Sequence, residues 1–217
     1  MEKLYPDSGV ELTPFTARHY DAMMRFGSFG KYNGFIKNAI SKLAIQPADT
    51  ILDMGCGTGK NACPISKYLS ADAGAKLTGM DISDIMGEQF AENCSALPFA
   101  SFLHQRIDQP FDLGIKFDKV FISFVLHGFP HDIRQIIIKN AWDHLKTGGT
   151  FNILDFAEFD MKKMPFLHRF VFKKIECKYA FDYIEKDWKE ILSGFGFKDF
   201  KEDLFFKDYV RLLRTRR

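Results

Sequence analysis

The chain has 217 residues, of which 46% are hydrophobic and 27% are charged, and its net charge is +2. These proportions are typical of an ordinary globular protein that is long enough to bury a substantial core. The near-neutral charge gives no bulk attraction to nucleic acid, so we expect no nucleic-acid partner. No apolar run is long enough for a membrane-spanning helix.

The cysteines give no sign of a disulfide framework or a zinc site, because none of them has C-x-x-C spacing. We expect reduced thiols in the cytoplasm and no bound metal. The amino terminus, Met1-Glu2-Lys3, leads into no apolar segment of the kind found in signal peptides. The four cysteines are Cys56, Cys63, Cys94 and Cys177.

Two helical segments are expected ahead of the first strand, between Phe15 and Leu43. An N-terminal cap of this kind closes a ligand from water or packs against the sheet, and the two roles are compatible.

Helical and strand signals then alternate from about Thr50 to Asp155, which favours a parallel sheet with helices on both faces. Apolar residues at helical spacing predict a helix over Asp132–Leu145, and the Lys146-Thr147-Gly148-Gly149 run predicts its end. Two closing strands are expected in the tail, near 197–201 and 209–213. The core strands are predicted at 50–54, 76–80, 101–106, 118–123 and 149–155.

A glycine-rich turn follows the first of these strands, in the run Ile51-Leu52-Asp53-Met54-Gly55-Cys56-Gly57-Thr58-Gly59-Lys60. Its glycines reach positive φ and let a ligand sit on the backbone, and a helix is expected over residues 60–69. The second strand ends on Asp81, about 20 positions past the turn, where a carboxylate can accept both ribose hydroxyls. Together the turn and Asp81 predict a nucleoside ligand.

The spacing within the turn indicates which nucleoside. It reads D-x-G-x-G-x-G rather than the G-x-G-x-x-G of dinucleotide sites, and the P-loop signature is absent. Asp53 would repel a pyrophosphate but suits a ligand with a cationic end. S-adenosylmethionine (SAM) has such an end, an ammonium and a sulfonium. We predict SAM as the cofactor, bound through Gly55, Cys56, Gly57 and Gly59, with Asp53 orienting the turn or the ammonium.

Apolar residues near the strand ends are placed to flank the adenine ring. Ile82 follows the second strand, Met86 lies one helical turn further on, and Ile107 follows the third strand. For Met86, packing in the core is an equal alternative.

A polar group for the adenine amine is expected after the third strand, and two registers remain open. Counting back from Pro110 gives Gln105, whereas the nearest carboxylate is Asp108. Either side chain can accept a hydrogen bond from an amine.

The end of the fourth strand should face the transferable methyl group. Ser123 can hydrogen-bond the cofactor or a nearby backbone group. His127 is the best candidate for a general base because the unperturbed histidine pKa lies near 6.5, with a purely structural role as the alternative. His131 is a second candidate, although Pro130 and Asp132 beside it indicate a helix cap on the solvent side.

Four segments resemble the motifs of class I SAM-dependent methyltransferases and together cover residues 45–157. The resemblance implies an α/β, Rossmann-like, doubly wound sheet of seven strands, mostly parallel with an antiparallel last strand. The segments are Ile51–Lys60, Gly79–Ser83, Phe117–Val120 and Leu145–Gly149.

A narrower likeness is to the ubiquinone/menaquinone C-methyltransferases. It is carried by His19-Tyr20-Asp21-Ala22-Met23-Met24, Ile122-Ser123-Phe124 and Ile153-Leu154-Asp155-Phe156. In that family the Tyr-Asp segment helps to cover the cofactor, which implies that Tyr20 is a SAM-site residue. This chain has His127-Gly128 where the family carries Arg-Asn, and it is shorter after the fifth strand. These differences count against a quinol acceptor and leave the cofactor unaffected.

The expected activity is methyl transfer from SAM to a small, apolar or aromatic acceptor. The alternatives are methylation of RNA or protein, an inactive SAM-binding protein, and a nicotinamide-dependent oxidoreductase, which the glycine spacing disfavours. One methyltransferase domain is expected. Its parts are an N-terminal helical cap at 1–45, a SAM-binding core at 46–156, a variable substrate-cap segment at 157–185, and a closing helix and strands at 186–217.

The Lys162–Lys174 segment mixes basic and large apolar residues. We expect a substrate-cap helix from Pro165, with inward aromatic rings and solvated lysines. The alternative is a helix that lies on anionic lipid, a peripheral membrane contact. The Arg214–Arg217 run is expected to be a solvated tail.

Overall fold

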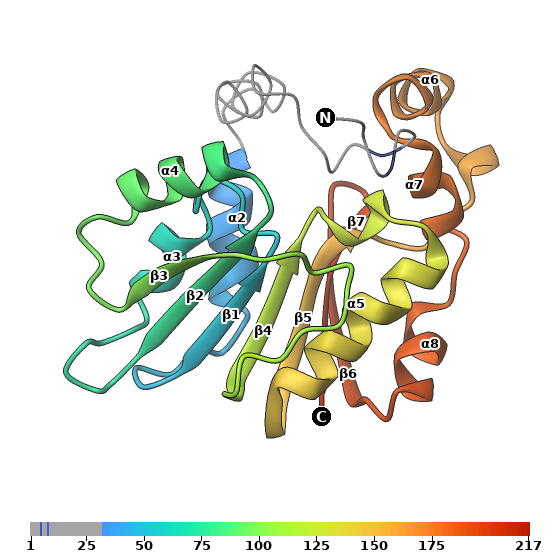
Figure 1. Ribbon diagram of the computed structural model, residues 1–217. Helices are drawn as coiled ribbons and strands as arrows, with labels where there is room; N and C mark the ends of the chain where they lie inside the picture. Colours follow the sequence, from blue (N-terminus) through green and yellow to red (C-terminus); the bar gives the residue numbers. More distant parts are fainter. Residues whose placement is uncertain (1–4, 6–7, 9–31) are drawn as a thin grey trace.

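The strands form one seven-stranded sheet in the order β3-β2-β1-β4-β5-β7-β6 (Figure 1). The computed structural model describes residues 5, 8 and 32–217. Strands β1 to β5 are parallel, and β7 is antiparallel to both of its neighbours, so the predicted fold class is confirmed. The strands are β1 Thr50–Met54, β2 Lys76–Asp81, β3 Ala100–His104, β4 Phe117–Ser123, β5 Leu145–Phe156, β6 Lys198–Phe205 and β7 Val210–Arg216.

Helices cover both faces of the sheet and build two apolar cores. Side chains of α2, α3 and α4 pack on one face, and those of α5, α7 and α8 pack on the other. Successive strand residues serve opposite faces, as Ile51 and Leu52 do on β1. The helices are α2 Tyr32–Ser41, α3 Ala62–Ser66, α4 Asp84–Asn93, α5 His131–His144, α6 Phe166–Ile175, α7 Lys178–Tyr183 and α8 Trp188–Gly194, with 3₁₀ turns η1 Leu126–Gly128 and η2 Met161–Lys163.

The predicted helix after the glycine turn was too long. Helix α3 begins only at Ala62, because the preceding residues form tight turns in which Gly59 N–H donates to the Cys56 carbonyl and Ala62 N–H to the Gly59 carbonyl. The helix also ends early, at Ser66, where Tyr68 N–H donates to the Ile65 carbonyl in another tight turn.

Two further predictions, the start of β5 and the state of the terminal arginines, were also wrong. Strand β5 starts at Leu145, opposite Phe117, and not near residue 149, so the Lys146–Gly149 run lies inside the strand, whereas helix α5 ends at His144, one residue before its predicted end. Arg214 and Arg216 are part of β7, and Arg217 is hydrogen-bonded to β5, so these residues are not a solvated tail. Arg214 donates to Asp203 at 2.5 Å, and Arg217 N–H donates to the Gly149 carbonyl at 2.9 Å.

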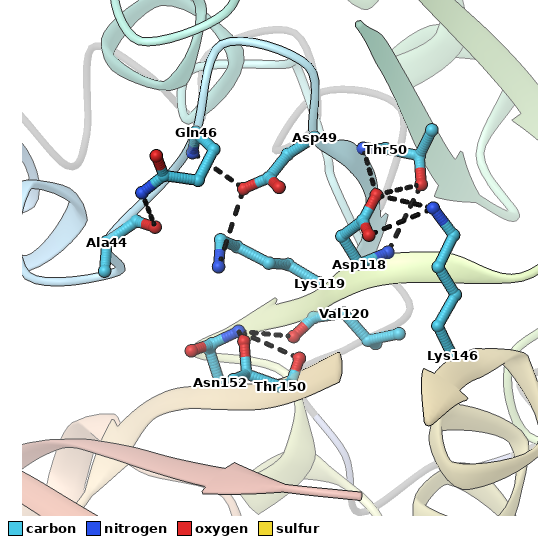
Figure 2. Close-up of polar contacts among 10 residues, drawn as sticks. All are labelled: Ala44, Gln46, Asp49, Thr50, Asp118, Lys119, Val120, Lys146, Thr150 and Asn152. Carbon is cyan, nitrogen blue, oxygen red and sulfur yellow. Dashed lines mark hydrogen bonds and ion pairs between the residues drawn. The ribbon is translucent and has the colours of Figure 1, made fainter. Parts of the chain in front are cut away.

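Polar side chains join the strands at the edge where β1 and β4 begin (Figure 2). The Asp118 carboxylate accepts from Thr50 N–H at 2.8 Å, from the Thr50 hydroxyl at 2.7 Å and from Lys146 at 2.8 Å. Burial acts to raise the pKa of Asp118, but these hydrogen bonds outweigh it and lower the pKa. Asp118, although part of a motif-like segment, therefore joins strands at the edge opposite the carboxyl ends.

Only part of the expected N-terminal cap can be located. Helix α2 buries Ile36, Ala39 and Ile40 against the sheet, which agrees with the packing role. The rest of the cap, including Tyr20, lies outside the described residues. Among the helices described, none has the length and apolarity needed to cross a bilayer.

Candidate functional site

The carboxyl ends of five parallel strands meet at one edge of the sheet, and the strand order reverses there between β1 and β4. Met54 lies opposite Met80 on one side and Ile122 on the other, which puts the glycine turn between the ends of β2 and β4. Such a reversal is where open α/β sheets bind ligands. The polar residues at or just past these ends are Gln105 after β3, Asp81 on β2, Ser123 on β4 and Asp155 on β5.

The three glycines of the turn have different roles, although all have positive φ. A Cβ on Gly55 would lie 2.7 Å from Val125, and one on Gly59 would lie 2.7 Å from Phe90, so both sites need glycine for packing. A Cβ on Gly57 would meet only Met86, at 4.0 Å. The backbone at Gly57 therefore borders open space in which a ligand can approach.

Cys56 is held inside the turn. Its N–H donates to the Met80 carbonyl at 2.9 Å, and its carbonyl accepts from Gly59 at 3.1 Å. The buried side chain packs beneath the turn against Gly79, and burial raises the pKa of the thiol. The predicted contact of Cys56 with the cofactor remains a prediction about its backbone.

Asp53 is buried at the strand end with 1% of its surface exposed. Neither carboxylate oxygen has a hydrogen-bond partner among the described residues. Burial raises the pKa of Asp53 to about 7; the Asn61 amide opposes this shift and the Asp81 charge adds to it. A buried carboxylate without a partner is costly unless something cationic compensates it, which fits the ammonium or sulfonium of SAM.

Asp81 is fixed by backbone donors at the end of β2. Its carboxylate accepts from Gly57 N–H and from Ser83 N–H, each at 3.0 Å. The remaining lone pairs of the half-buried carboxylate are available to other donors. Of the two apolar candidates beside it, Ile82 is 42% exposed, whereas Met86 is 3% exposed. Met86 therefore belongs mainly to the core, and only its sulfur approaches Gly57.

The two candidates for the adenine amine have different surroundings. The Asp108 carboxylate is buried and accepts from the Arg106 guanidinium at 2.5 Å and from the Tyr5 hydroxyl at 2.7 Å. Burial acts against ionisation, but these partners prevail and lower the pKa of Asp108. Gln105 N–H donates to the Asp81 carbonyl at 3.1 Å, which puts Gln105 directly beside the ribose candidate. This geometry favours Gln105 over Asp108 as the acceptor for the adenine amine. Ile107 is buried in the core.

The chain turns sharply after Ser123, at the end of β4. Phe124 has a φ of 54°, a strained value for a residue with a side chain, and its N–H donates to the Leu154 carbonyl at 2.8 Å. Val125 then packs on Gly55. This turn directs η1, which carries His127, back over the end of β5.

His127 lies between two carboxylates. Its Nδ1 is 2.7 Å from Asp155 Oδ1, its backbone N–H donates to Asp155 Oδ2 at 3.1 Å, and its Nε2 is 3.7 Å from Glu176 Oε2. Burial alone would lower the pKa of His127, but the two carboxylates outweigh it and raise the pKa. Burial raises the pKa of Glu176, and the His127 charge opposes that rise.

Aromatic rings surround His127 on the α6 and α7 side. Phe156 lies 4.9 Å and Tyr183 lies 6.4 Å from the imidazole, measured between ring centres. Phe172 of α6 packs edge-on against Phe156 at 5.1 Å. We define the aromatic cluster as Phe124, Phe156, Phe159, Phe172, Phe181 and Tyr183; all but Tyr183 are only half-buried.

Arg134 fixes α7 against η1. The Arg134 side chain is fully buried and donates to the His127 carbonyl at 3.2 Å, to the Tyr179 carbonyl at 2.6 Å and to Asp182 at 2.8 Å. It also stacks over the Tyr183 and Trp188 rings. The buried guanidinium therefore links the segment after β5 to the turn that carries His127.

Sequence reasoning missed Asp155, Glu176 and Arg134. Asp155 was detectable, because it lies one residue before the carboxyl end of a parallel strand. Glu176 lies at the end of α6, and no spacing relates it to His127. His131 stays apart from these groups and contacts Gln135 at 3.1 Å. The described residues contain no group of three or more side chains suited to a metal ion.

The sequence is similar to known methyltransferases. A family model described as "Methyltransferase domain" matches residues 51–149. The ubiquinone/menaquinone biosynthesis C-methyltransferase of Geotalea daltonii is 26% identical over 87% of each chain. The demethylmenaquinone methyltransferase of Desulfitobacterium hafniense is 26% identical over 65% of this chain, but the match spans only 56% of that relative.

Solved structures agree on the fold. A SAM-dependent methyltransferase from Aquifex aeolicus superposes with a TM-score of 0.66 at 14% identity, covering 95% of this chain and 100% of that one. Magnesium protoporphyrin IX methyltransferase from Synechocystis, solved with bound SAH, superposes with a TM-score of 0.64 at 20% identity. The match covers 86% of this chain and 83% of that one. The methyltransferase domain matched over residues 51–149, the relatives and the sheet with its glycine turn and strand-end acid support a class I SAM-dependent methyltransferase.

Proposed function

We propose that the protein transfers the methyl group of SAM to a small, apolar or aromatic acceptor that lies against the aromatic cluster. The observation that carries this proposal is the set of half-buried aromatic rings around His127, beside the end of β4. Exposed ring faces offer apolar contact area for such an acceptor. The relatives named for quinone and menaquinone methylation also support an apolar ring acceptor.

The groups that would hold the cofactor are those at the ends of β1, β2, β3 and β4. We assign the backbone at Gly55, Gly57 and Gly59 and the buried Asp53 to its methionine end, with Cys56 supporting the turn. We assign Asp81 to the ribose, and Ile82, Met86, Ile107 and Gln105 to the adenine, with Asp108 supporting that side through Arg106 and Tyr5. Ser123 and, outside the described residues, Tyr20 complete the proposed set. The bound cofactor supplies an electrophilic methyl group on a sulfonium.

The protein contributes mainly position and exclusion of water. Holding a nucleophile and a methyl group in line can supply up to about 7–11 kcal/mol of the barrier. Charge disperses as a sulfonium loses its methyl, so an apolar wall favours the transition state. His127 is proposed to orient the acceptor and to take its proton, with Asp155 holding the imidazole by Nδ1.

The arrangement of the chain supports two further proposals. All strands in the described residues belong to one sheet, which favours a single methyltransferase domain with the predicted core and closing segments. The four cysteines are free thiols, which favours a reducing cytoplasm.

A pair of phenylalanine variants tests the acceptor site. Phe172→Ala removes a ring of the cluster, whereas Phe166→Ala removes a ring that is 75% exposed on the same helix. Both are assayed for SAH formation with a panel of phenols, aromatic acids and quinols. We expect the KM for the acceptor to rise about tenfold for Phe172→Ala and not for Phe166→Ala, with SAM affinity unchanged in both. Equal effects of the two variants, or turnover only with protein or RNA, would overturn the proposal.

A further inference from the structure

Helix α6 and the turn before it present phenylalanines between pairs of lysines. We define the α6 surface as Lys162, Lys163, Phe166, Phe170, Lys173 and Lys174, all of them exposed. Phe166 and Phe170 are four residues apart and so lie on the same side of the helix. The lysine pairs flank them, one in η2 and one in the last turn of α6.

The exposure of these rings is unusual within the structure. Phe166 is 75% exposed, more than any other large hydrophobic side chain in the described part of the chain, and Phe170 is 53% exposed. Helix α6 stands at the margin of the fold, at the upper right in Figure 1. Two neighbouring exposed phenylalanines on one helix indicate a surface that contacts something apolar.

The charge of this segment differs from that of the rest of the chain. Residues 161–175 contain five lysines and arginines and no acidic residue, whereas the whole chain has a net charge of +2. In the described residues no ion pair involves Lys162, Lys163, Lys173 or Lys174. Some other exposed lysines are paired, as Lys139 is with Asp143 at 2.7 Å and Lys189 with Glu202 at 3.0 Å. The α6 surface is therefore an uncompensated positive patch.

We propose that the α6 surface docks on an anionic lipid bilayer. Its exposed phenylalanines can enter the boundary between headgroups and acyl chains, while the lysines bind lipid phosphates. The ten residues of α6 are too few to span a bilayer, so the helix lies in the plane of the interface. This inference rests on the surface alone and does not depend on the identity of the methyl acceptor.

Docking in this way would bring the membrane close to the proposed acceptor site. Phe172 of the same helix contacts Phe156 at 5.1 Å and Phe181 at 5.7 Å, and Glu176 at the end of α6 faces His127. Only one helix would then separate the headgroup region from the aromatic cluster. An apolar acceptor dissolved in the bilayer would have a short path to the methyl donor.

Vesicle co-sedimentation with the full chain tests the proposal. We expect the protein to bind vesicles of phosphatidylcholine mixed with phosphatidylglycerol, not vesicles of phosphatidylcholine alone, and binding should weaken as salt is added. Phe166→Ser combined with Phe170→Ser should reduce the partition coefficient at least about tenfold. Lys173→Gln combined with Lys174→Gln should reduce it by about fivefold per lysine.

Matched controls separate docking from general loss of charge or apolar surface. Ile115→Ser removes another exposed apolar side chain, and Lys198→Gln with Lys201→Gln removes two exposed lysines of β6. We expect these controls to bind as the natural chain does, and all variants to keep its melting temperature and SAM affinity. No binding to anionic vesicles at low salt, equal loss in the controls, or binding that survives loss of both phenylalanines would overturn the proposal. Tighter, phenylalanine-independent binding to a single-stranded RNA would do so as well.

Discussion

Asp53 combines burial at the strand end with a pKa of about 7, so its protonation state changes near neutral pH. The shift has a consequence for stability. Because the folded pKa is raised above the unfolded value, this contribution to folding is fully present below the unfolded pKa, is lost as pH rises from there to about 7, and does not change further above the folded pKa. A cationic ligand would reverse this by favouring the ionised form.

Asp53→Asn should therefore have two effects. The variant should gain stability over the natural chain, and the gain should be larger at pH 8 than at pH 5. We expect the SAM affinity of the natural chain to increase between pH 6 and pH 8 as Asp53 ionises, and the variant should lose part of that increase. Thermal melting and calorimetry in buffers of different ionisation enthalpy measure both. Identical proton release on SAM binding by the variant and the natural chain would refute this role for Asp53.

The imidazole of His127 is the other titratable centre of the site. Its raised pKa means that the charged form stabilises the fold below the ordinary value near 6.5, and that this contribution is lost as pH rises through the raised pKa. A general base must be neutral, so activity should rise with pH over the same interval.

Asp155→Asn removes the largest favourable charge on His127 and should shift the inflection of kcat/KM to lower pH. His127→Gln should remove the inflection and lower kcat by about 10²–10⁴-fold. His131→Gln, which changes a histidine that hydrogen-bonds Gln135 outside the cluster, is the control and should leave the profile as it is. If the inflection stays in place when Asp155 or His127 is changed, His127 has only a structural role.

At the scale of elements, the glycines of the turn differ in role within five residues: two are needed for packing, and one borders the space proposed for the ligand. Gly55 and Gly59 are closed by Val125 and Phe90, whereas Gly57 faces open space and donates its N–H to Asp81. The turn, β2 and the η1 segment are thus fitted to one another independently of any ligand.

Alanine at Gly55 and at Gly57 should separate these roles. Both variants lose about 1–2 kcal/mol because of positive φ. Gly55→Ala adds a clash with Val125, so its main effect should be a further drop in melting temperature. Gly57→Ala should fold but bind SAM at least about tenfold more weakly, because its Cβ enters the ligand's space. Calorimetry and thermal melting measure the pair; a folded Gly57→Ala protein with full SAM affinity would contradict the proposed cradle.

Across the whole molecule, the features that the sequence predicted well are those set by residues close together in the chain. The strands followed from short buried apolar runs, the edge where their carboxyl ends meet from the alternation of strands and helices, and the place of Asp81 at the end of β2 from its distance to the glycine turn. The ends of elements were less predictable, because pairing decides them. Strand β5 begins at Leu145 because Phe117 lies beside it, and β7 extends to Arg216 because β5 and β6 offer partners on both sides.

The contacts of the candidate site were predictable only in part, because most of them are not local. Residue spacing gave His127 but not its partners, which lie 28 and 49 residues further along the chain. Asp108 was a reasonable candidate for the adenine by chemistry. Its engagement by Arg106 and Tyr5 depends on how residue 5 packs against the site, which no local pattern describes.

The most direct measurement follows the methyl group. The full chain is incubated with SAM labelled in the methyl group and an extract of its host, which is then fractionated into solvent-extractable small molecules, protein and RNA. We predict label in the small-molecule fraction, its loss with Asp81→Asn, and its retention with the neighbouring Asp84→Asn, whose side chain is 81% exposed. Label confined to protein or RNA, or equal labelling with Asp81→Asn, would contradict the account.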